Sequence, residues 1–270
     1  MTKSADVDQQ RDDHRAPVLE INDLEVSFGS TRVLKGVSTQ VSFGKTLGVV
    51  GESGSGKSTL AKAIVGINKP SGGQIVFDGR DLGAMRPRER RSVTRQIQLI
   101  PQDPYSSLDP RRTIGQTIAE AIDPVRSDPK RHREAIAHWL SVILLDDDVA
   151  LRYPHEFSGG QRQRIAIARA LAVGPKLIIA DEVTSALDVS VQAEILKLID
   201  ALRTELDLTM LFISHNLDVV YQVSDSVLVL NHGDVMEQGA VRSVYAEPAH
   251  PYTRALLDAV PGGPGFDIGE

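Results

Sequence analysis

The pattern of apolar and polar residues changes along the chain, from alternation near the N-terminus to helical spacing further on. Residues 18–28 alternate as a half-buried strand does, and residues 31–43 repeat that alternation. The short apolar run 47–51 ends in glycine and is followed by helical spacing over 57–67. Residues 72–82 are typical of a strand followed by a glycine turn. The front part therefore predicts antiparallel strands and then a strand–loop–helix unit.

From about residue 103 to 158 the chain shows helical periodicity between turns rich in Pro and Asp, which predicts an inserted helical subdomain. Beyond it, strands and helices alternate, an order typical of a parallel sheet with crossover helices. The expected elements are a buried strand over 177–182, a helix over 189–206, a strand over 209–215, a helix over 219–223 and a hairpin over 226–239 with HGD at its turn. These elements predict the α/β fold class.

The composition excludes several kinds of protein. The chain has 270 residues, a formal net charge of −6 and no cysteine. Without cysteine there are no disulfides, thiolate zinc sites or Cys-ligated iron–sulfur clusters, and the mildly acidic balance argues against a chain built to coat nucleic acid. No apolar run approaches the ~18 residues of a membrane span. The polar residues 1–16 are expected to form a disordered tail rather than a signal peptide. The basic run 85–95 is interpreted as a solvated face, with contact to lipid headgroups as the alternative.

The segment GESGSGKS at 51–58 carries the chemistry of a phosphate-binding loop. It matches G-x-x-x-x-G-K-[ST] between a predicted strand and a predicted helix. Its three glycines allow backbone amides to wrap closely around oxyanions, and the helix that begins near Lys57 directs its dipole at the phosphates. Lys57 supplies a cation for the β- and γ-phosphate oxygens, and Ser58 offers a hydroxyl to Mg²⁺. The segment predicts a nucleoside triphosphate and Mg²⁺ as ligands.

A pair of acidic residues ends the sequence LIIADE at 177–182. The four apolar residues place Asp181 at the C-terminal end of a buried parallel strand, where ligands bind in open α/β sheets. Asp181 is then able to hold Mg²⁺ through water, and Glu182 to orient or deprotonate an attacking water. Two adjacent acids also occur in ordinary loops, but their position after a phosphate-binding loop favours the catalytic interpretation.

The sequence FSGGQ at 157–161 is a second glycine-rich cradle ahead of a helix. With the phosphate-binding loop, FSGGQ and LIIADE in this order, the chain resembles the ATP-binding-cassette (ABC) family of transport ATPases from about residue 18 to 260. The resemblance implies a P-loop (RecA-like) core with an antiparallel β subdomain and an inserted α-helical subdomain, and ATP and Mg²⁺ as cofactors. In that family two subunits sandwich two ATPs head to tail, so the second cradle is expected to act on the partner's ATP. A Gly-Gly hinge before a surface helix is the alternative.

The resemblance implies a role for individual residues. Gln102 falls at the Q-loop position that touches Mg²⁺ or the lytic water, and His215 at the switch position that contacts the γ-phosphate together with Glu182. Phe28 falls where the family stacks an aromatic ring on adenine, with burial in a strand as the alternative. The implied ATP-binding residues also include Gly51, Glu52, Ser53, Gly54, Ser55, Gly56, Lys57, Ser58 and Thr59. The signature loop is Ser158, Gly159, Gly160 and Gln161, and the implied metal ligands are Ser58, Gln102 and Asp181. The implied dimer-interface loop, for which a helix cap is the alternative, is Ser185, Ala186, Leu187 and Asp188.

Four positions depart from the family's usual residues. Phe157 stands where Leu is commoner, Val183 where Pro is usual, Phe28 where Tyr is usual, and Asn216 where Asp is frequent. None of these changes removes a catalytic functional group. A competent ATPase is therefore still expected.

The C-terminal sequence AEPAHPYTRALLDAVP at 246–261, together with DVSVQAEI after the interface loop, resembles the importer ATPases for oligopeptides, dipeptides and nickel. The resulting organisation is a disordered tail over 1–16, an ABC ATPase domain over 17–245 with its helical subdomain at about 103–172, and a C-terminal extension over 246–270.

The resemblance implies an enzyme that hydrolyses ATP, closes as a dimer and energises an importer of oligopeptides or dipeptides, or else of nickel or a related solute. The implied partners are integral-membrane permease subunits, a second ABC ATPase subunit that is either the same chain or a paralogue, and an extracytoplasmic solute-binding protein, but no nucleic acid. The implied location is the cytoplasmic side of the cell membrane, as a peripheral protein. An alternative is a non-transport ATPase module of a cytosolic enzyme, such as a phosphonate-cleaving complex. A soluble translation or DNA-repair ATPase is a third reading, but such proteins usually carry tandem cassettes or long coiled-coil insertions.

Overall fold

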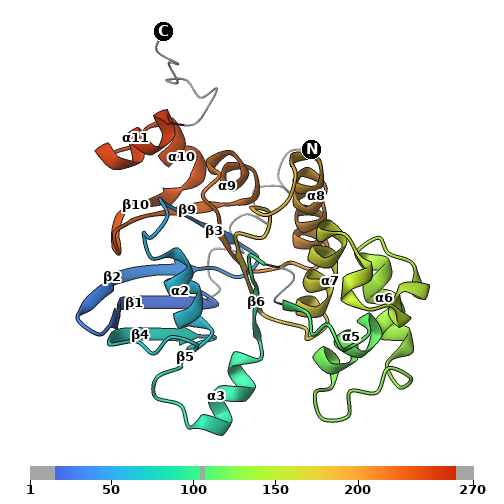
Figure 1. Cartoon of the computed structure of the whole chain (residues 1–270). Helices are drawn as coiled ribbons and strands as arrows, with labels where there is room; N and C mark the ends of the chain where they lie inside the picture. Colours follow the sequence, from blue (N-terminus) through green and yellow to red (C-terminus); the bar gives the residue numbers. More distant parts are fainter. Residues whose placement is uncertain (1–15, 104–106, 260–270) are drawn as a thin grey trace, which may run out of the picture.

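The computed structural model describes residues 16–103 and 107–259, and the strands in this part of the chain form two sheets (Figure 1). The smaller sheet is antiparallel, as the alternation near the N-terminus predicts. Alternate residues of its central strand, including Leu19 and Ile21, are buried. The strand order is β2 (Thr31–Val41), β1 (Leu19–Phe28), β4 (Gly72–Phe77) and β5 (Arg80–Asp81).

The larger sheet is parallel except at one edge. Its strand order is β10 (Asp234–Ala240), β9 (Ser226–Asn231), β3 (Thr46–Val50), β8 (Met210–Ile213), β7 (Leu177–Asp181) and β6 (Ile97–Ile100), with β10 antiparallel to β9 across the predicted hairpin. Every residue of β3, β7 and β8 is buried, because strands covered on both faces need apolar side chains on both. The carboxyl ends of β3, β6, β7 and β8 consequently meet at one edge of the sheet.

A group of helices lies between β6 and β7 in the chain and stands apart from the antiparallel sheet (Figure 1). This is the region where the sequence predicts a helical subdomain. The structure agrees with the helical character of that segment, and the limits 103 and 172 stay a prediction. The helices are α5 (Ile114–Ile122), α6 (Arg133–Val142), the 3₁₀ turns η2 (Asp147–Leu151) and η3 (Pro154–Glu156), and α7 (Gly159–Leu171).

The remaining helices cover the large sheet or follow it. α2 (Lys57–Ile64) and α8 (Val189–Glu205) lie where helical spacing predicts them. α3 (Pro87–Thr94) forms from the basic run and buries only Val93, so none of its basic side chains is buried, and the choice between a solvated face and contact with lipid headgroups stays a prediction. The other three are α9 (Leu217–Val223), α10 (Val241–Ala246) and α11 (Pro251–Asp258). The predicted tail 1–16 falls outside the described residues except for Ala16, as do 260–270 of the predicted C-terminal extension.

Two apolar clusters cover the two faces of the large sheet. Leu177 and Ile179 of β7 belong to the cluster that includes the antiparallel sheet and α2. Ile178 and Ala180 of the same strand belong to the cluster that includes α5 to α9. This alternation fixes the register of β7 and thereby the position of Asp181 at its end. None of the helices within 16–103 and 107–259 is both long enough and apolar enough to cross a membrane.

Candidate active site

The loop 51–56 joins the C-terminal end of β3 to α2, and its shape depends on glycine. Gly51, Gly54 and Gly56 have φ angles of 151°, 82° and 109°, values that disfavour any side chain. A Cβ atom on Gly51 would lie 2.1 Å from the carbonyl oxygen of Leu230, so only glycine fits where the loop passes β9. Gly56 is the N-cap of α2, and no side chain caps that helix. The N-terminal end of α2 is therefore able to face an anion with its backbone amides.

The ammonium group of Lys57 is held by the loop itself. Its Nζ atom donates to the carbonyl oxygens of Gly51, at 2.7 Å, and Glu52, at 2.8 Å. The residue is only 5% exposed, and burial lowers the pKa of its ammonium, an effect partly opposed by nearby carboxylates such as Glu182. A buried cation at the start of a helix is suited to an anionic ligand.

Ser58 and Asp181 form the candidate metal site. The Ser58 hydroxyl donates to Oδ1 of Asp181 across 3.1 Å, joining the start of α2 to the end of β7. Burial raises the pKa of the Asp181 carboxyl, and the bond from Ser58 only partly opposes this. Oxygen donors and a desolvated carboxylate suit Mg²⁺, because the cation would restore the charge balance that burial disturbs. These residues therefore fit the predicted metal.

Glu182 receives contacts from two other strand ends. Gln102, after β6, donates from Nε2 to Oε2 of Glu182 at 3.1 Å and to the hydroxyl of Ser185 at 3.1 Å. His215, after β8, has its Nδ1 atom 3.5 Å from the same oxygen of Glu182. The backbone of Glu182 has φ 49°, a conformation that residues other than glycine rarely adopt. Such strain concentrates at functional sites and persists only where the surroundings hold it.

A cleft of about 370 Å³ brings several of the predicted residues together. Gln102 and Glu182 line it together with residues of the phosphate-binding loop. Val33 of β2, which sequence reasoning missed, also lines it; its strand pattern gives no sign of a ligand contact. Phe28 is not among the lining residues and is 53% exposed, so its predicted stacking on adenine stays a prediction. The residues of the loop and α2 that line the cleft are Ser53, Gly54, Gly56, Lys57, Ser58 and Thr59.

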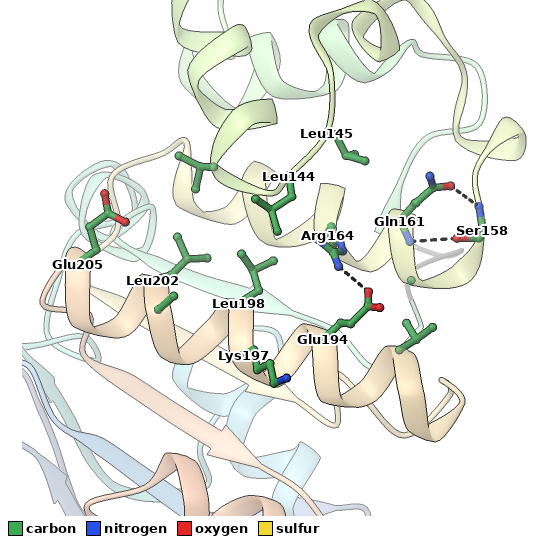
Figure 2. A pocket seen from close by; sticks show the side chains of 14 residues that line it. Leu144, Leu145, Ser158, Gln161, Arg164, Glu194, Lys197, Leu198, Leu202 and Glu205 are labelled. Atoms are coloured by element: carbon green, nitrogen blue, oxygen red, sulfur yellow. Dashed lines mark hydrogen bonds and ion pairs between the residues drawn. The ribbon is translucent and has the colours of Figure 1, made fainter.

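The signature loop lies elsewhere in the subunit. The Ser158 hydroxyl accepts from the amide of Gln161, and the Gln161 side chain accepts from the amide of Ser158, a reciprocal cap on α7. Ser158, Gly160 and Gln161 line a different pocket, of about 840 Å³, between α7 and α8 (Figure 2). The two phosphate cradles predicted from the sequence are therefore separate within one chain. Action of Ser158 on a partner's ATP stays a prediction.

The predicted interface loop connects the acidic pair to α8. The Ser185 hydroxyl donates to the carbonyl oxygen of Glu182 at 2.9 Å. Asp188 caps α8 by accepting from the amide of Val191 at 3.0 Å, which is the alternative role weighed from the sequence. Ala186 is exposed, and the side chain of Leu187 approaches Gly159 of the signature loop. A contact of this loop across a dimer stays a prediction.

Comparison with known proteins identifies the family. The family model described as ABC transporter matches residues 34–185, more than half of the chain. The chain belongs to the ABC transporter family. Among its ABC relatives, the oligopeptide transport ATP-binding protein OppF of Escherichia coli (strain K12) is 46% identical over 265 residues, covering 92% of this chain and 78% of OppF. The oligopeptide transport ATP-binding protein AppF of Bacillus subtilis (strain 168) is 45% identical, covering 90% of this chain and 78% of AppF.

Solved structures of ABC proteins share the fold. CbiO1 from Clostridium perfringens, part of the ABC transporter complex cbiONQ, superposes with a TM-score of 0.78 at 29% identity, covering 86% of this chain and 92% of that one. The ATP-binding cassette MJ0796, in a dimeric post-hydrolysis state bound to ADP and Pi, superposes with a TM-score of 0.73 at 28% identity, covering 83% of this chain and 99% of that one. The predicted family and the predicted P-loop α/β fold are confirmed.

Proposed function

We propose that this ABC subunit hydrolyses ATP and thereby energises an importer of oligopeptides or dipeptides. The observation that carries the enzymatic part is the meeting of four strand ends: the loop after β3, Gln102 after β6, Asp181 and Glu182 at β7, and His215 after β8. Phosphoryl transfer depends on positioning and electrostatics, and these residues supply both.

Each residue has a definite task in hydrolysis. The amides of loop 51–56 and the ammonium of Lys57 hold the phosphates. Ser58, Asp181 and Gln102 would hold Mg²⁺, which when bound would neutralise negative charge on the phosphates. Glu182 accepts a proton from the attacking water as the water oxygen bonds to the γ-phosphorus and the bond to the β–γ bridging oxygen breaks. His215 and Gln102 orient the Glu182 carboxylate.

The second cradle completes the site in a dimer. Ser158 and the amides of Gly159 and Gly160 stand at the N-terminal end of α7, a helix of 13 residues, and are not among the residues that line the subunit's own cleft. A two-fold arrangement brings the cradle of each subunit to the nucleotide of the other, which yields two composite sites. The partner is a second copy of this chain or a paralogue with the same motifs.

The transport part of the proposal rests on the names of the relatives. OppF and AppF are oligopeptide transport ATP-binding proteins, and a relative from Brucella ovis that is 45% identical is called a putative peptide import ATP-binding protein. We accordingly propose permease subunits and an extracytoplasmic solute-binding protein as partners, and the cytoplasmic face of the membrane as the location. Nucleic acid has no part in this function.

Affinity purification of the tagged chain from detergent-solubilised cells of its own organism tests the proposal. We expect a multi-span permease to copurify, and we expect uptake of radiolabelled trialanine to fall when the chromosomal copy carries Lys57→Ala. Purification with soluble proteins alone, together with unchanged peptide uptake, would instead favour the ATPase module of a cytosolic enzyme.

A further inference from the structure

The segment after β10 returns to the phosphate-binding loop. α10 and α11 follow the hairpin and lie beyond its edge of the large sheet (Figure 1). Tyr252, in the first turn of α11, accepts a hydrogen bond at its hydroxyl oxygen from the backbone amide of Glu52, with 3.4 Å between the two atoms. Glu52 is the second residue of the phosphate-binding loop and precedes Tyr252 by 200 positions. A contact between segments so far apart in the chain requires both to be held in place.

The start of α11 is held by polar contacts that fix the direction of Tyr252. The carboxylate of Glu237, on β10, accepts from the amides of Ala249, at 2.9 Å, and His250, at 3.1 Å. His250 is the N-cap of α11, and its Nδ1 atom accepts from the amide of Tyr252 at 3.1 Å. Pro251 occupies the first helical position, where its ring suits the backbone. The sequence AHPY, part of the segment that resembles the importer ATPases, thus holds the tyrosine where its hydroxyl reaches the loop.

The peptide unit of Glu52 is held from two directions. Its amide donates to Tyr252, and its carbonyl oxygen accepts from the ammonium of Lys57 at 2.8 Å. Glu52 is exposed, so water is able to replace the tyrosine as a partner for the amide. The contact is therefore not needed to satisfy a buried group. Its consequence is to restrict the conformation of the loop that presents Lys57.

We propose that Tyr252 is a positioning residue of the nucleotide site, through which the C-terminal segment fixes the Gly51–Glu52 end of the phosphate-binding loop. This inference rests on the proposed function, because it concerns the same nucleotide. Tyr252 touches the loop backbone and not the reacting atoms. Removal of its hydroxyl loosens the loop and weakens the binding of diphosphate as well as triphosphate nucleotides, while the fold stays intact.

Calorimetric titration of the purified full chain with MgADP tests the inference. MgADP probes the phosphate-binding loop without a γ-phosphate, so that contacts of His215 and ATP-driven dimer closure do not contribute. Tyr252→Phe removes one hydroxyl and keeps the ring; we expect Kd to rise about 2- to 10-fold, the range of one ordinary hydrogen bond. Hydrogen exchange of the peptide amides over 49–56 should accelerate in the same variant, while the Tm stays within about 1 °C.

Tyr245→Phe is the matched control. It removes a tyrosine hydroxyl from α10 that donates to the carbonyl oxygen of Leu217 at 2.8 Å, outside the phosphate-binding loop. We expect this variant to lose thermal stability without a change in MgADP affinity or in exchange over 49–56. Equal effects of the two variants on Kd, or a Tyr252→Phe protein with wild-type Kd and exchange, would overturn the inference.

A second variant tests the contact between Tyr252 and the loop by changing Glu237, which holds the start of α11. Glu237→Gln weakens the contacts that orient α11, and it should raise Kd for MgADP in the wild-type background but add little when Tyr252→Phe is already present. Full additivity of the two changes would contradict a shared route through Tyr252. Absence of MgADP binding by the wild-type chain would refute the proposed ATPase function instead, so the two failures are distinguishable.

Discussion

The side-chain amide of Gln102 donates to the carboxylate of Glu182 across 3.1 Å, which joins the end of β6 to the end of β7. The carboxylate is thereby oriented by the segment that leads out of the parallel sheet toward the helical region. His215 approaches the same oxygen, at 3.5 Å, from the end of β8. A displacement of either neighbouring segment would change the direction of the Glu182 carboxylate, the group we propose as the general base.

Replacement of Glu182, the proposed general base, should separate nucleotide binding from hydrolysis. Glu182→Gln keeps the length of the side chain and removes its negative charge, so we expect MgATP to bind while the rate of hydrolysis falls by ~10²–10⁴-fold. The variant should accumulate as an ATP-bound dimer in size-exclusion chromatography. Glu134→Gln, at an exposed position on α6, is the matched control and should retain wild-type turnover. Near-normal hydrolysis by Glu182→Gln would refute the assignment.

Loss of the loop cation should weaken nucleotide binding itself. Lys57→Ala removes a charge-assisted contact to phosphate, and such contacts account for roughly a 10- to 100-fold change in Kd. Turnover should fall together with affinity in a phosphate-release assay. Lys69→Ala, which removes an exposed lysine, controls for the change in net charge. Wild-type hydrolysis by a pure Lys57→Ala preparation would place the nucleotide somewhere else.

The buried carboxylate of Asp181 should lower the stability of the nucleotide-free protein, although we expect hydrolysis to require it. Because burial raises its pKa, the native state binds a proton here more readily than the unfolded chain, and the ionised form costs stability at neutral pH. Asp181→Asn should therefore raise the Tm of the nucleotide-free protein at pH 7 and abolish Mg²⁺-dependent hydrolysis. The gain should shrink as pH falls through the raised pKa and vanish below the unfolded value near 3.8.

Thermal unfolding is able to measure the stability difference between Asp181→Asn and the wild type, since a change of 1 kcal/mol in the free energy of unfolding moves the Tm of a chain of this size by roughly 2–4 °C. Asp147→Asn, at an exposed position, is the control and should show no such gain. A lower Tm of Asp181→Asn at pH 7 would contradict the argument, because it would mean that the charged form stabilises the fold.

Lesions in the signature loop should act on the partner's nucleotide. Ser158→Arg places a bulky side chain in the proposed interface, and Ser158→Asp adds a negative charge while keeping an acceptor that caps α7. Each homodimer should bind MgADP normally and fail to hydrolyse ATP. Mixed with Lys57→Ala protein, which is also inactive alone, each should recover up to about half of the activity per heterodimer if the two sites act independently.

Hydrolysis by the heterodimer falls further if the two sites depend on each other. The amount of nucleotide trapped at its one intact composite site should therefore be measured as well. If the natural partner is a paralogue, the two lesions must be placed on separate chains. Normal hydrolysis by Ser158→Arg protein, alone and with its partner, would show that the second cradle has no role in trans.

The sequence predicted the site residues that stand directly at the ends of apolar strands. Gly51, Asp181 and His215 follow buried runs in β3, β7 and β8, and in a parallel sheet such positions must meet. α10 was not predicted, because a helix of six residues is too short to show periodicity. The contact of Tyr252 with Glu52 was not predictable either, since it depends on the three-dimensional arrangement of the β9–β10 hairpin and the N-terminal end of α11.

Because Lys57 donates hydrogen bonds to its own loop, nucleotide binding involves an exchange of hydrogen-bond partners. The ammonium has three N–H donors and gives two of them to carbonyl oxygens, at 2.7 and 2.8 Å, so a second contact to a phosphate oxygen would replace one of these carbonyl acceptors. The enthalpy gained at the phosphates is then offset by the enthalpy lost at Gly51 and Glu52, and affinity reflects the difference between two sets of ligands. A lysine that changes partners also releases the carbonyl oxygens it leaves, so the backbone of Gly51 and Glu52 would lose a restraint each time a nucleotide takes the cation.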